Sequence, residues 1–337
     1  MLTDEFISYI KGVRRYSPRT CIIYEEALKE FTEYLADGGT ALEDSGLLKA
    51  LTPDTLRNYE VELLDSRRLD PRTVNLHISV LSSFCKYLLG RGLTASNPAK
   101  LITRPKVAKR IPEFYRKESM DSYFRETEYF SSEEALDEYI SLVESGESGE
   151  SATKMKCSFY NRRLYRLIIS IFYQTGIRRA ELLGLKVSSI DFKRSKLTVT
   201  GKGDKMREIP LTSSLCKEIS LYLKAVDTMA GRVRTKDEPL LVSEKGNMLY
   251  PVFIDRVIKG ELGQTDGITG RKSPHVLRHT LATELLDSGA DMYSIKELLG
   301  HSSLAATQVY THNSIEKLKK VYLNAHPRAK RGGKNGD

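Results

Sequence analysis

The segment HVLRHTLATELL, residues 275–286, contains the side chains best suited to bind an anion. Ser273 and Pro274 precede it, and these residue types favour the N-cap and the first turn of a helix. His275 and Arg278 then lie three residues apart on one face of the first turns, beside the positive end of the helix dipole. A guanidinium, an imidazole and a helix N-terminus together form a site of the kind that holds phosphate.

The same helix has a second interpretation, a zinc site formed by His275 and His279 at i, i+4 spacing. However, Val276 and Leu277 occupy the inner positions, so the glutamate of HExxH is missing. No acidic third ligand follows at an obvious spacing either. The pattern therefore favours the phosphate site, with His279 in the core or behind that site.

Two further basic side chains stand where they could reach a phosphate. In YQTGIRRAELLGL, residues 173–185, Arg178 precedes Glu181 by three positions, which predicts an ion pair that holds the guanidinium in place. In GKGDKMREIPL, Lys202 lies between two glycines at a predicted hairpin tip, which suits reaching into a nucleic-acid groove. An ordinary helix-surface pair and a solvated turn lysine are the alternatives. The GKG sequence lacks the GxxxxGK[ST] pattern, so a nucleotide-binding P-loop is not indicated.

GHSSLAATQVYTH, residues 300–312, places two titratable rings, His301 and Tyr310, nine positions apart. On one continuous helix these rings would lie on opposite faces. Gly300 stops helices, so we predict that one helix ends there and that a short second helix starts at the serines after His301. This bend permits the two rings to face a common point, but it does not bring them together by itself.

The composition restricts the class of protein. The 337 residues include 53 Lys and Arg against 44 Asp and Glu, a formal net charge of +9, which favours a polyanionic partner. An anionic membrane is the rival partner, but no basic amphipathic helix with Trp or Phe anchors is present. The four cysteines form no CxxC pair, no secretory signal is visible, and the strongest apolar stretch, 167–173, is too short to cross a bilayer. We therefore expect a reduced, cytoplasmic protein.

The elements that must position these residues divide into two regions. Residues 2–90 predict only helices, roughly four, with starts at Ser17-Pro18, Thr52-Pro53 and Asp70-Pro71. Residues 94–114 contain three prolines and five basic side chains without a sustained period, which indicates a linker.

The region after the linker mixes helix and strand. A Ser/Gly/Glu run at 144–151 indicates a flexible surface loop, and a buried helix fits 162–174. Apolar and polar residues alternate in KLTVT at 196–200 and in MREIPL at 206–211, which predicts a β-hairpin. The chain from 250 to about 326 is helical again. The predicted fold is mainly α, with a small antiparallel sheet in the C-terminal region.

Taken in order, these segments resemble the tyrosine recombinases, especially the Xer-type and phage-integrase-like members. TGIRRAELLGL resembles their first arginine motif, GKGDKMREIPL their β-hairpin lysine motif and HVLRHTLATELL their His-x-x-Arg motif. LLGHSSLAATQVYTH resembles the motif of the second histidine and the nucleophile, and IEKLKKVYLNAHPRA the Xer-type C-terminus. Four motifs in the right order, from Arg178 to Tyr310, make this resemblance specific, and it covers nearly the whole chain.

The resemblance implies how a scissile DNA phosphate would be bound. Arg178 and Arg278 would hold its non-bridging oxygens, for which guanidinium geometry is suited. His275 and His301 would complete the hydrogen bonding, with His275 helping to deprotonate the attacking phenol. Glu181 would support Arg178 without acting as a catalyst.

The resemblance also implies the transfer step. Tyr310 would attack the phosphorus to give a 3′-phosphotyrosyl link, and Lys202 would protonate the departing 5′-oxygen. This link stores the phosphodiester energy, and fixed cations neutralise the charge, so ATP, a cofactor and a metal ion are not implied. The implied enzyme is a site-specific recombinase that cleaves and rejoins duplex DNA for integration, excision, inversion or chromosome dimer resolution.

The domains and partners follow from the same resemblance. It implies a SAM-like helical core-DNA-binding domain at 1–103, a basic linker at 104–112 and a mixed α/β catalytic domain at 113–329, followed by a basic disordered tail at 330–337. Double-stranded DNA with a specific recombination site would be the partner, and a homotetramer would form on it. An accessory protein is an option, and no membrane partner is implied. A helix at about 314–325 would dock in cis or in trans, since its apolar face suits both.

Three other functions fit the sequence less well. A strand-relaxing topoisomerase would use the same chemistry, but the helical N-terminal region and the Xer-type ending disfavour it. A non-catalytic DNA-binding architectural protein would be expected to lose some of the six site residues, and all six are present. A metal-dependent phosphoesterase would need carboxylate clusters, which we do not find in the sequence.

Overall fold

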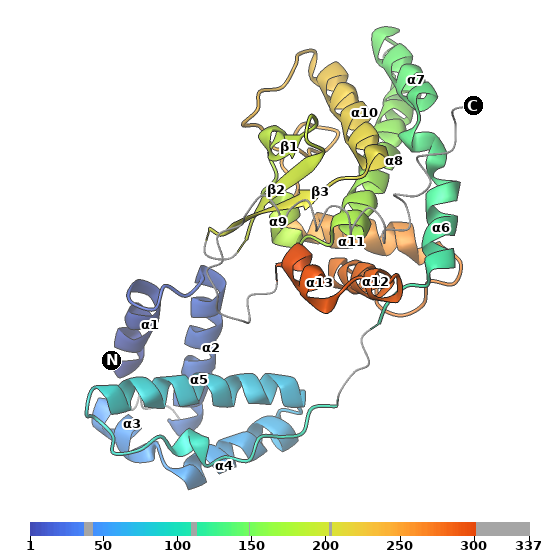
Figure 1. Cartoon of the computed structure of the whole chain (residues 1–337). Coiled ribbons are helices and arrows are strands. Elements are labelled where there is room, and N and C mark those ends of the chain that lie inside the picture. The colour runs from blue at the N-terminus through green and yellow to red at the C-terminus, as the bar shows by residue number, and fades with distance from the viewer. Residues whose placement is uncertain (37–42, 109–112, 148, 202–203, 301–337) are drawn as a thin grey trace. The chain divides into compact units, whose positions relative to one another are not determined.

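The computed structural model describes the chain except for residues 37–42, 109–112, 148, 202–203 and 301–337. The chain divides into two compact units, Met1–Arg110 and Ile111–Asp337 (Figure 1). The described part is mainly helical and contains one small antiparallel sheet, which confirms the predicted fold class. No helix in this part has the length and the apolar run needed to span a bilayer.

The first unit is a helical bundle with its own apolar core. Its elements are α1 (Leu2–Gly12), α2 (Pro18–Leu35), α3 (Asp44–Ala50), α4 (Pro53–Val61), the π-helical turn η1 (Glu62–Ser66), α5 (Pro71–Gly90) and the 3-10 turn η2 (Pro98–Lys100). The three predicted helix starts are confirmed. Ser17, Thr52 and Asp70 each accept a backbone N–H at the N-cap, and a proline follows each of them in the first turn.

A polar pair lies in the core of this bundle. Tyr59 on α4 and His77 on α5 are both buried, and the Tyr59 hydroxyl lies 3.1 Å from His77 Nδ1. Burial lowers the pKa of His77, which Glu30 opposes and Arg67 reinforces. Folding therefore favours the neutral imidazole.

We expect the protein to lose stability as the pH falls below about 6.5, the ordinary pKa of histidine. Unfolded His77 takes up a proton there, whereas folded His77 stays neutral until a lower pH, so acid favours the unfolded chain. His77→Gln removes this titration, and its melting temperature should fall less than that of the wild type between about pH 7.5 and about pH 5.5. Thermal unfolding of both proteins in matched buffers checks this. Equal losses in the two proteins would exclude His77 as the group responsible.

The second unit is built around one long helix. Its helical elements are α6 (Lys117–Glu126), η3 (Glu128–Ser131), α7 (Glu133–Glu144), α8 (Glu150–Thr175), α9 (Arg179–Leu183), η4 (Val187–Ser189), α10 (Ser213–Ala230), α11 (Pro251–Gly263), α12 (Pro274–Asp287) and α13 (Met292–Leu299). α8 contacts α7, α10, α11 and α12 (Figure 1), and every residue from Arg166 to Thr175 is buried. This stretch of α8 has no solvent-exposed face, and α8 is therefore the centre of this core.

The extent of α8 corrects one boundary. The helix predicted at 162–174 begins at Glu150 instead, so both ends of the Ser/Gly/Glu run at 144–151 belong to helices α7 and α8. The apolar periodicity that predicts a buried helix is absent from the polar first turns of α8.

The sheet has the order β1-β2-β3, with β1 (Ile190–Asp191), β2 (Lys196–Thr200) and β3 (Met206–Pro210). The predicted hairpin is confirmed as β2 and β3, which pair antiparallel with Thr200 opposite Met206. β1 was not predicted, because two residues are too short to show an alternating pattern.

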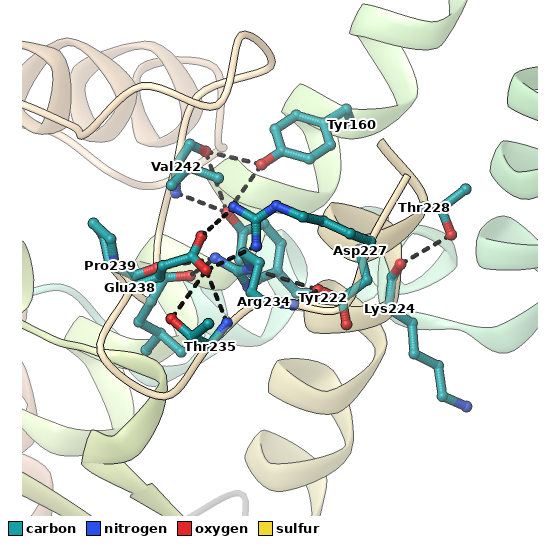
Figure 2. Close-up of polar contacts among 12 residues, drawn as sticks. Tyr160, Tyr222, Lys224, Asp227, Thr228, Arg234, Thr235, Glu238, Pro239 and Val242 are labelled. Carbon is teal, nitrogen blue, oxygen red and sulfur yellow. Dashed lines mark hydrogen bonds and ion pairs between the residues drawn. The ribbon is translucent and has the colours of Figure 1, made fainter. Parts of the chain in front are cut away.

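A buried polar network holds the connection that follows α10 (Figure 2). The hydroxyl groups of Tyr160 and Tyr222 lie 3.0 Å apart and both donate to the Val242 carbonyl, at 2.9 and 3.2 Å. Arg234 is 9% exposed and donates to the Pro239 carbonyl at 2.9 Å. These contacts fix the connection without involving any of the predicted site residues.

Candidate active site

Arg178 stands at the start of α9, where α8 has just ended. Gly176 ends α8 with a φ of +60°, and a Cβ there would lie 2.5 Å from Leu299 Cδ2. Arg178 is the N-cap residue of α9, and it donates from Nη1 to Glu181 Oε1 at 2.9 Å. Glu181 Oε2 accepts the backbone N–H of Arg178 at 2.8 Å. The predicted pair is therefore present, across the start of the helix rather than along its surface.

Arg207 on β3 binds the same carboxylate and was missed in the sequence. Its Nη1 and Nη2 donate to the two oxygens of Glu181 at 2.9 and 2.8 Å. The strand pattern contained the signal, because Arg207 shares the inward face of β3 with Ile209. A charge on the buried face of a strand needs a buried partner.

Glu181 is a buried anion that stays charged. Burial alone would raise its pKa, but hydrogen bonds from Arg207 and Arg178 outweigh that effect and lower the pKa to about 2. One carboxylate therefore serves two guanidinium groups.

Arg278 enters the cluster from α12. It is 7% exposed, and it donates to the carbonyls of Gly176 and Leu299, each at 2.5 Å. Burial is the main cause that lowers the pKa of Arg278 to about 10, and the nearby positive charges of Arg178 and Arg207 add to it. Arg278 therefore remains a cation at neutral pH.

The three arginines meet at the C-terminal end of α13. Its last carbonyls each accept from a different one: Leu298 from Arg207 at 3.1 Å, Leu299 from Arg278 at 2.5 Å and Gly300 from Arg178 at 2.7 Å. The negative end of a helix dipole favours cations at this place. The cluster contains three guanidinium groups and the single carboxylate of Glu181, which binds two of them, so it retains excess positive charge. Such a site can bind a further anion.

His275 and His279 are both exposed on α12. Partial desolvation lowers the pKa of His275, and the positive charges of Arg271 and Arg278 lower it further, so the neutral imidazole can accept a proton. The prediction of a core position for His279 is wrong, because His279 shares the exposed face of His275 one turn later. Among the residues that the structure describes, no group of three or more His, Cys, Asp or Glu side chains could hold a metal ion.

The N-terminus of α12 differs in one detail from the prediction. Ser273 occupies the N-cap and Pro274 the first turn, as predicted, but the Ser273 side chain makes no capping hydrogen bond. Its buried hydroxyl has no partner within the described residues.

Three predicted site residues, Lys202, His301 and Tyr310, lie outside the described residues. The neighbours of two of them are described. Gly201 precedes Lys202, and a Cβ on it would lie 3.6 Å from Glu181 Oε1, so this end of the hairpin lies beside the cluster. Gly300 precedes His301, and its carbonyl accepts from Arg178.

Comparisons with known proteins agree on one family. Residues 152–317 match the profile of the phage integrase family, and residues 3–92 match the N-terminal SAM-like domain of phage integrases. Tyrosine recombinase XerC of Bacillus licheniformis is 33% identical over 329 residues, which cover 97% of this chain and 96% of the relative.

Two solved structures share the fold. The integrase of transposon Tn1549, in complex with transposon right-end DNA, has a TM-score of 0.62 at 14% identity and covers 95% of this chain and 98% of its own. A lambda integrase tetramer bound to a Holliday junction has a TM-score of 0.57 at 18% identity and covers 92% of this chain and 80% of its own.

Proposed function

Because this chain belongs to the phage integrase family and is a tyrosine-type site-specific recombinase, we propose that its arginine cluster binds the scissile phosphate of the DNA that it cleaves and rejoins. The convergence of Arg178, Arg207 and Arg278 from α9, β3 and α12 on the last carbonyls of α13, beside Glu181, carries this proposal. Arg178 is 38% exposed and reaches a ligand directly. Arg278 supplies a second guanidinium for the non-bridging oxygens.

We assign the transfer step to Tyr310 and Lys202. The Tyr310 oxygen forms a bond to phosphorus as the bond from phosphorus to the 5′-oxygen breaks, which leaves a 3′-phosphotyrosyl link. The phenolic proton passes to neutral His275, and Lys202 gives a proton to the 5′-oxygen. His301 donates a hydrogen bond to the phosphate. The lowered pKa of His275 supports its role as a proton acceptor.

The arginine cluster explains how a phenol can react near neutral pH. An ordinary phenol has a pKa of about 10, so it is a weak nucleophile until a positive site stabilises its anion and the charge that develops on phosphorus. Rejoining uses the same groups in reverse, with the 5′-hydroxyl of another strand as the nucleophile. The phosphotyrosyl link conserves the phosphodiester energy between the two steps.

The domain assignment follows the family. We propose a core-DNA-binding domain at 1–103, a basic linker at 104–112, a catalytic domain at 113–329 and a tail at 330–337. Duplex DNA with a specific site is the substrate, and a homotetramer assembles on it, as in the lambda integrase tetramer on a Holliday junction. The excess of basic residues suits this partner, and a DNA substrate of this kind places the enzyme in the cytoplasm.

A trapping experiment tests this function. Duplexes that the full-length protein binds are first selected from a random-sequence library, and the selected site is rebuilt with a nick beside the cleaved phosphate. We expect the wild type to form a covalent protein–DNA adduct in EDTA that survives denaturant. Tyr310→Phe removes the nucleophilic oxygen and should form no adduct while binding the same DNA.

Each other outcome has a clear meaning. An adduct that persists in Tyr310→Phe would remove Tyr310 as the nucleophile. Tight binding without an adduct in the wild type would favour a non-catalytic DNA-binding protein over the recombinase mechanism proposed above.

A further inference from the structure

We propose that Arg207 is a positioning residue of strand cleavage, which fixes Glu181, and through it Arg178, relative to the end of α13. This inference rests on the proposed role of Arg178. Arg207 is 8% exposed, and all three of its nitrogens donate to protein oxygens. These three contacts give Arg207 a task inside the cluster that does not require contact with the substrate.

The contacts of Arg207 join parts of the chain that are far apart in sequence. Its Nη1 and Nη2 hold Glu181 from 26 positions away, and its Nε holds the Leu298 carbonyl from 91 positions away. Only a guanidinium offers a planar pair of donors for a carboxylate together with a third donor.

Glu181 shows why Arg178 depends on this contact. Oε1 of Glu181 accepts from Nη1 of Arg178 and Nη1 of Arg207, while Oε2 accepts from the backbone N–H of Arg178 and Nη2 of Arg207. Each carboxylate oxygen is thus held from both sides, which leaves the group little freedom to rotate. Without Arg207 the carboxylate would lose half of these hydrogen bonds, and burial would then favour its neutral form.

The second contact reaches the backbone immediately before His301. A Cβ on Gly300 would lie 3.0 Å from Nη1 and 3.1 Å from Cζ of Arg207, so the guanidinium packs against this glycine. The Gly300 carbonyl also accepts from Arg178 at 2.7 Å. One side chain therefore sets both the support of Arg178 and the point from which the chain continues to His301 and Tyr310.

The test compares Arg207→Gln with Arg234→Gln in single-turnover cleavage of the nicked substrate at saturating protein. Arg234 is an equally buried arginine that also donates to backbone carbonyls, but it holds the connection after α10 (Figure 2). We expect Arg207→Gln to slow cleavage by about 10- to 100-fold, because small displacements of reacting groups have effects of this size. Arg234→Gln should stay within about 3-fold of the wild type, since none of its partners belongs to the cluster.

Two readouts separate positioning from a loss of stability. The double variant Arg207→Gln, Glu181→Gln should cleave little more slowly than the slower single variant. Both substitutions disrupt the same hydrogen bonds between Arg207 and Glu181. The pH profile should also change. Glu181 faces Arg178 at the start of α9, Arg207 on β3 and Arg278 on α12, and losing Arg207 raises its pKa. The ratio of the Arg207→Gln rate to the wild-type rate should therefore fall as the pH is lowered from about 8 to about 5.5.

Arg207→Lys provides a second variant if Arg207→Gln does not fold. Lysine keeps the charge beside Glu181 but cannot hold both oxygens and the Leu298 carbonyl, so cleavage should slow about 10-fold with a constant ratio to wild type across pH. A wild-type rate in Arg207→Lys, equal losses in Arg207→Gln and Arg234→Gln, or fully multiplicative effects with Glu181→Gln would each overturn the proposal. Wild-type adduct formation alongside any of these results would leave the recombinase function intact.

Discussion

Arg278→Gln is expected to slow single-turnover DNA cleavage by about 10²- to 10³-fold, the range for losing one preorganised donor to a developing anion. Arg278 is buried, so its charge acts through little intervening solvent. It also donates to the carbonyls of Gly176 and Leu299, which end the helices α8 and α13 at the site. The variant therefore loses both a phosphate ligand and the contact that joins these two helix ends.

The comparison with Arg278→Lys separates these two effects. Lysine keeps the positive charge but not the fork that reaches both carbonyls, so we expect a loss nearly as large as that of Arg278→Gln. A lysine variant close to the wild-type rate would show that charge alone is needed. Quench-flow measurement of adduct formation, with DNA saturation confirmed by gel shift, provides the rates.

Arg256→Gln is a suitable control for this experiment. Arg256 is exposed on α11, where it lies over the Phe253 ring and donates to the Tyr250 hydroxyl. Its replacement should leave the cleavage step within about 3-fold of the wild type, as for other surface changes away from a site. A rate for Arg278→Gln that matches this control would contradict the assignment of Arg278 to the phosphate.

The sequence predicts those features of the site that depend on local spacing. The ion pair of Arg178 and Glu181 spans three positions. The hairpin is predicted by the alternation of apolar and polar residues, and the N-cap of α12 by a Ser-Pro pair. Each is set by neighbours within a few residues, for which helix and strand geometry is enough.

Features set by tertiary contacts could not be predicted in this way. Arg207 lies within the hairpin lysine motif, yet its partners Glu181 and Leu298 are distant in sequence, so no local pattern identifies them. The exposure of His279 is a different case. Its spacing from His275 does place it on the same face, so the i, i+4 spacing alone would have indicated that the two side chains are exposed together.

A second large effect is expected at a buried ion pair that takes no part in the proposed DNA cleavage. Arg166→Met should lower the free energy of unfolding by about 3–5 kcal/mol, the usual cost of leaving one member of a buried pair without its partner. Arg166 on α8 and Glu218 on α10 are both almost fully buried, with Nε and Oε1 3.2 Å apart. Arg166 also donates to the carbonyl of Phe124 at 3.0 Å and to the hydroxyl of Thr127.

The cost arises mainly from the charge that remains. After the substitution, Glu218 keeps only the hydroxyl of Ser170, at 3.0 and 2.9 Å from its two oxygens, among the hydrogen bonds identified for it. A lone hydroxyl cannot replace a cation beside a desolvated carboxylate. The double variant Arg166→Met, Glu218→Leu should therefore recover part of the lost stability, because it removes the unpaired carboxylate, while Arg163 loses its attraction to Glu218.

Arg162→Met tests whether burial is the deciding factor. Arg162 lies one turn earlier on α8, and its side chain is 45% exposed and 3.9 Å from Glu261. Glu261 is 11% exposed, but solvent reaches the Arg162 side of this long pair and the Tyr123 hydroxyl still donates to Glu261, so the loss of the pair should change the free energy of unfolding by only about 0–1 kcal/mol. Urea unfolding of the full-length variants gives the free energies of unfolding. Hydrogen exchange of peptides from α8 and α10 shows whether the loss of stability arises in this unit. Equal losses in Arg162→Met and Arg166→Met would mean that the charge of Glu218 is satisfied without Arg166.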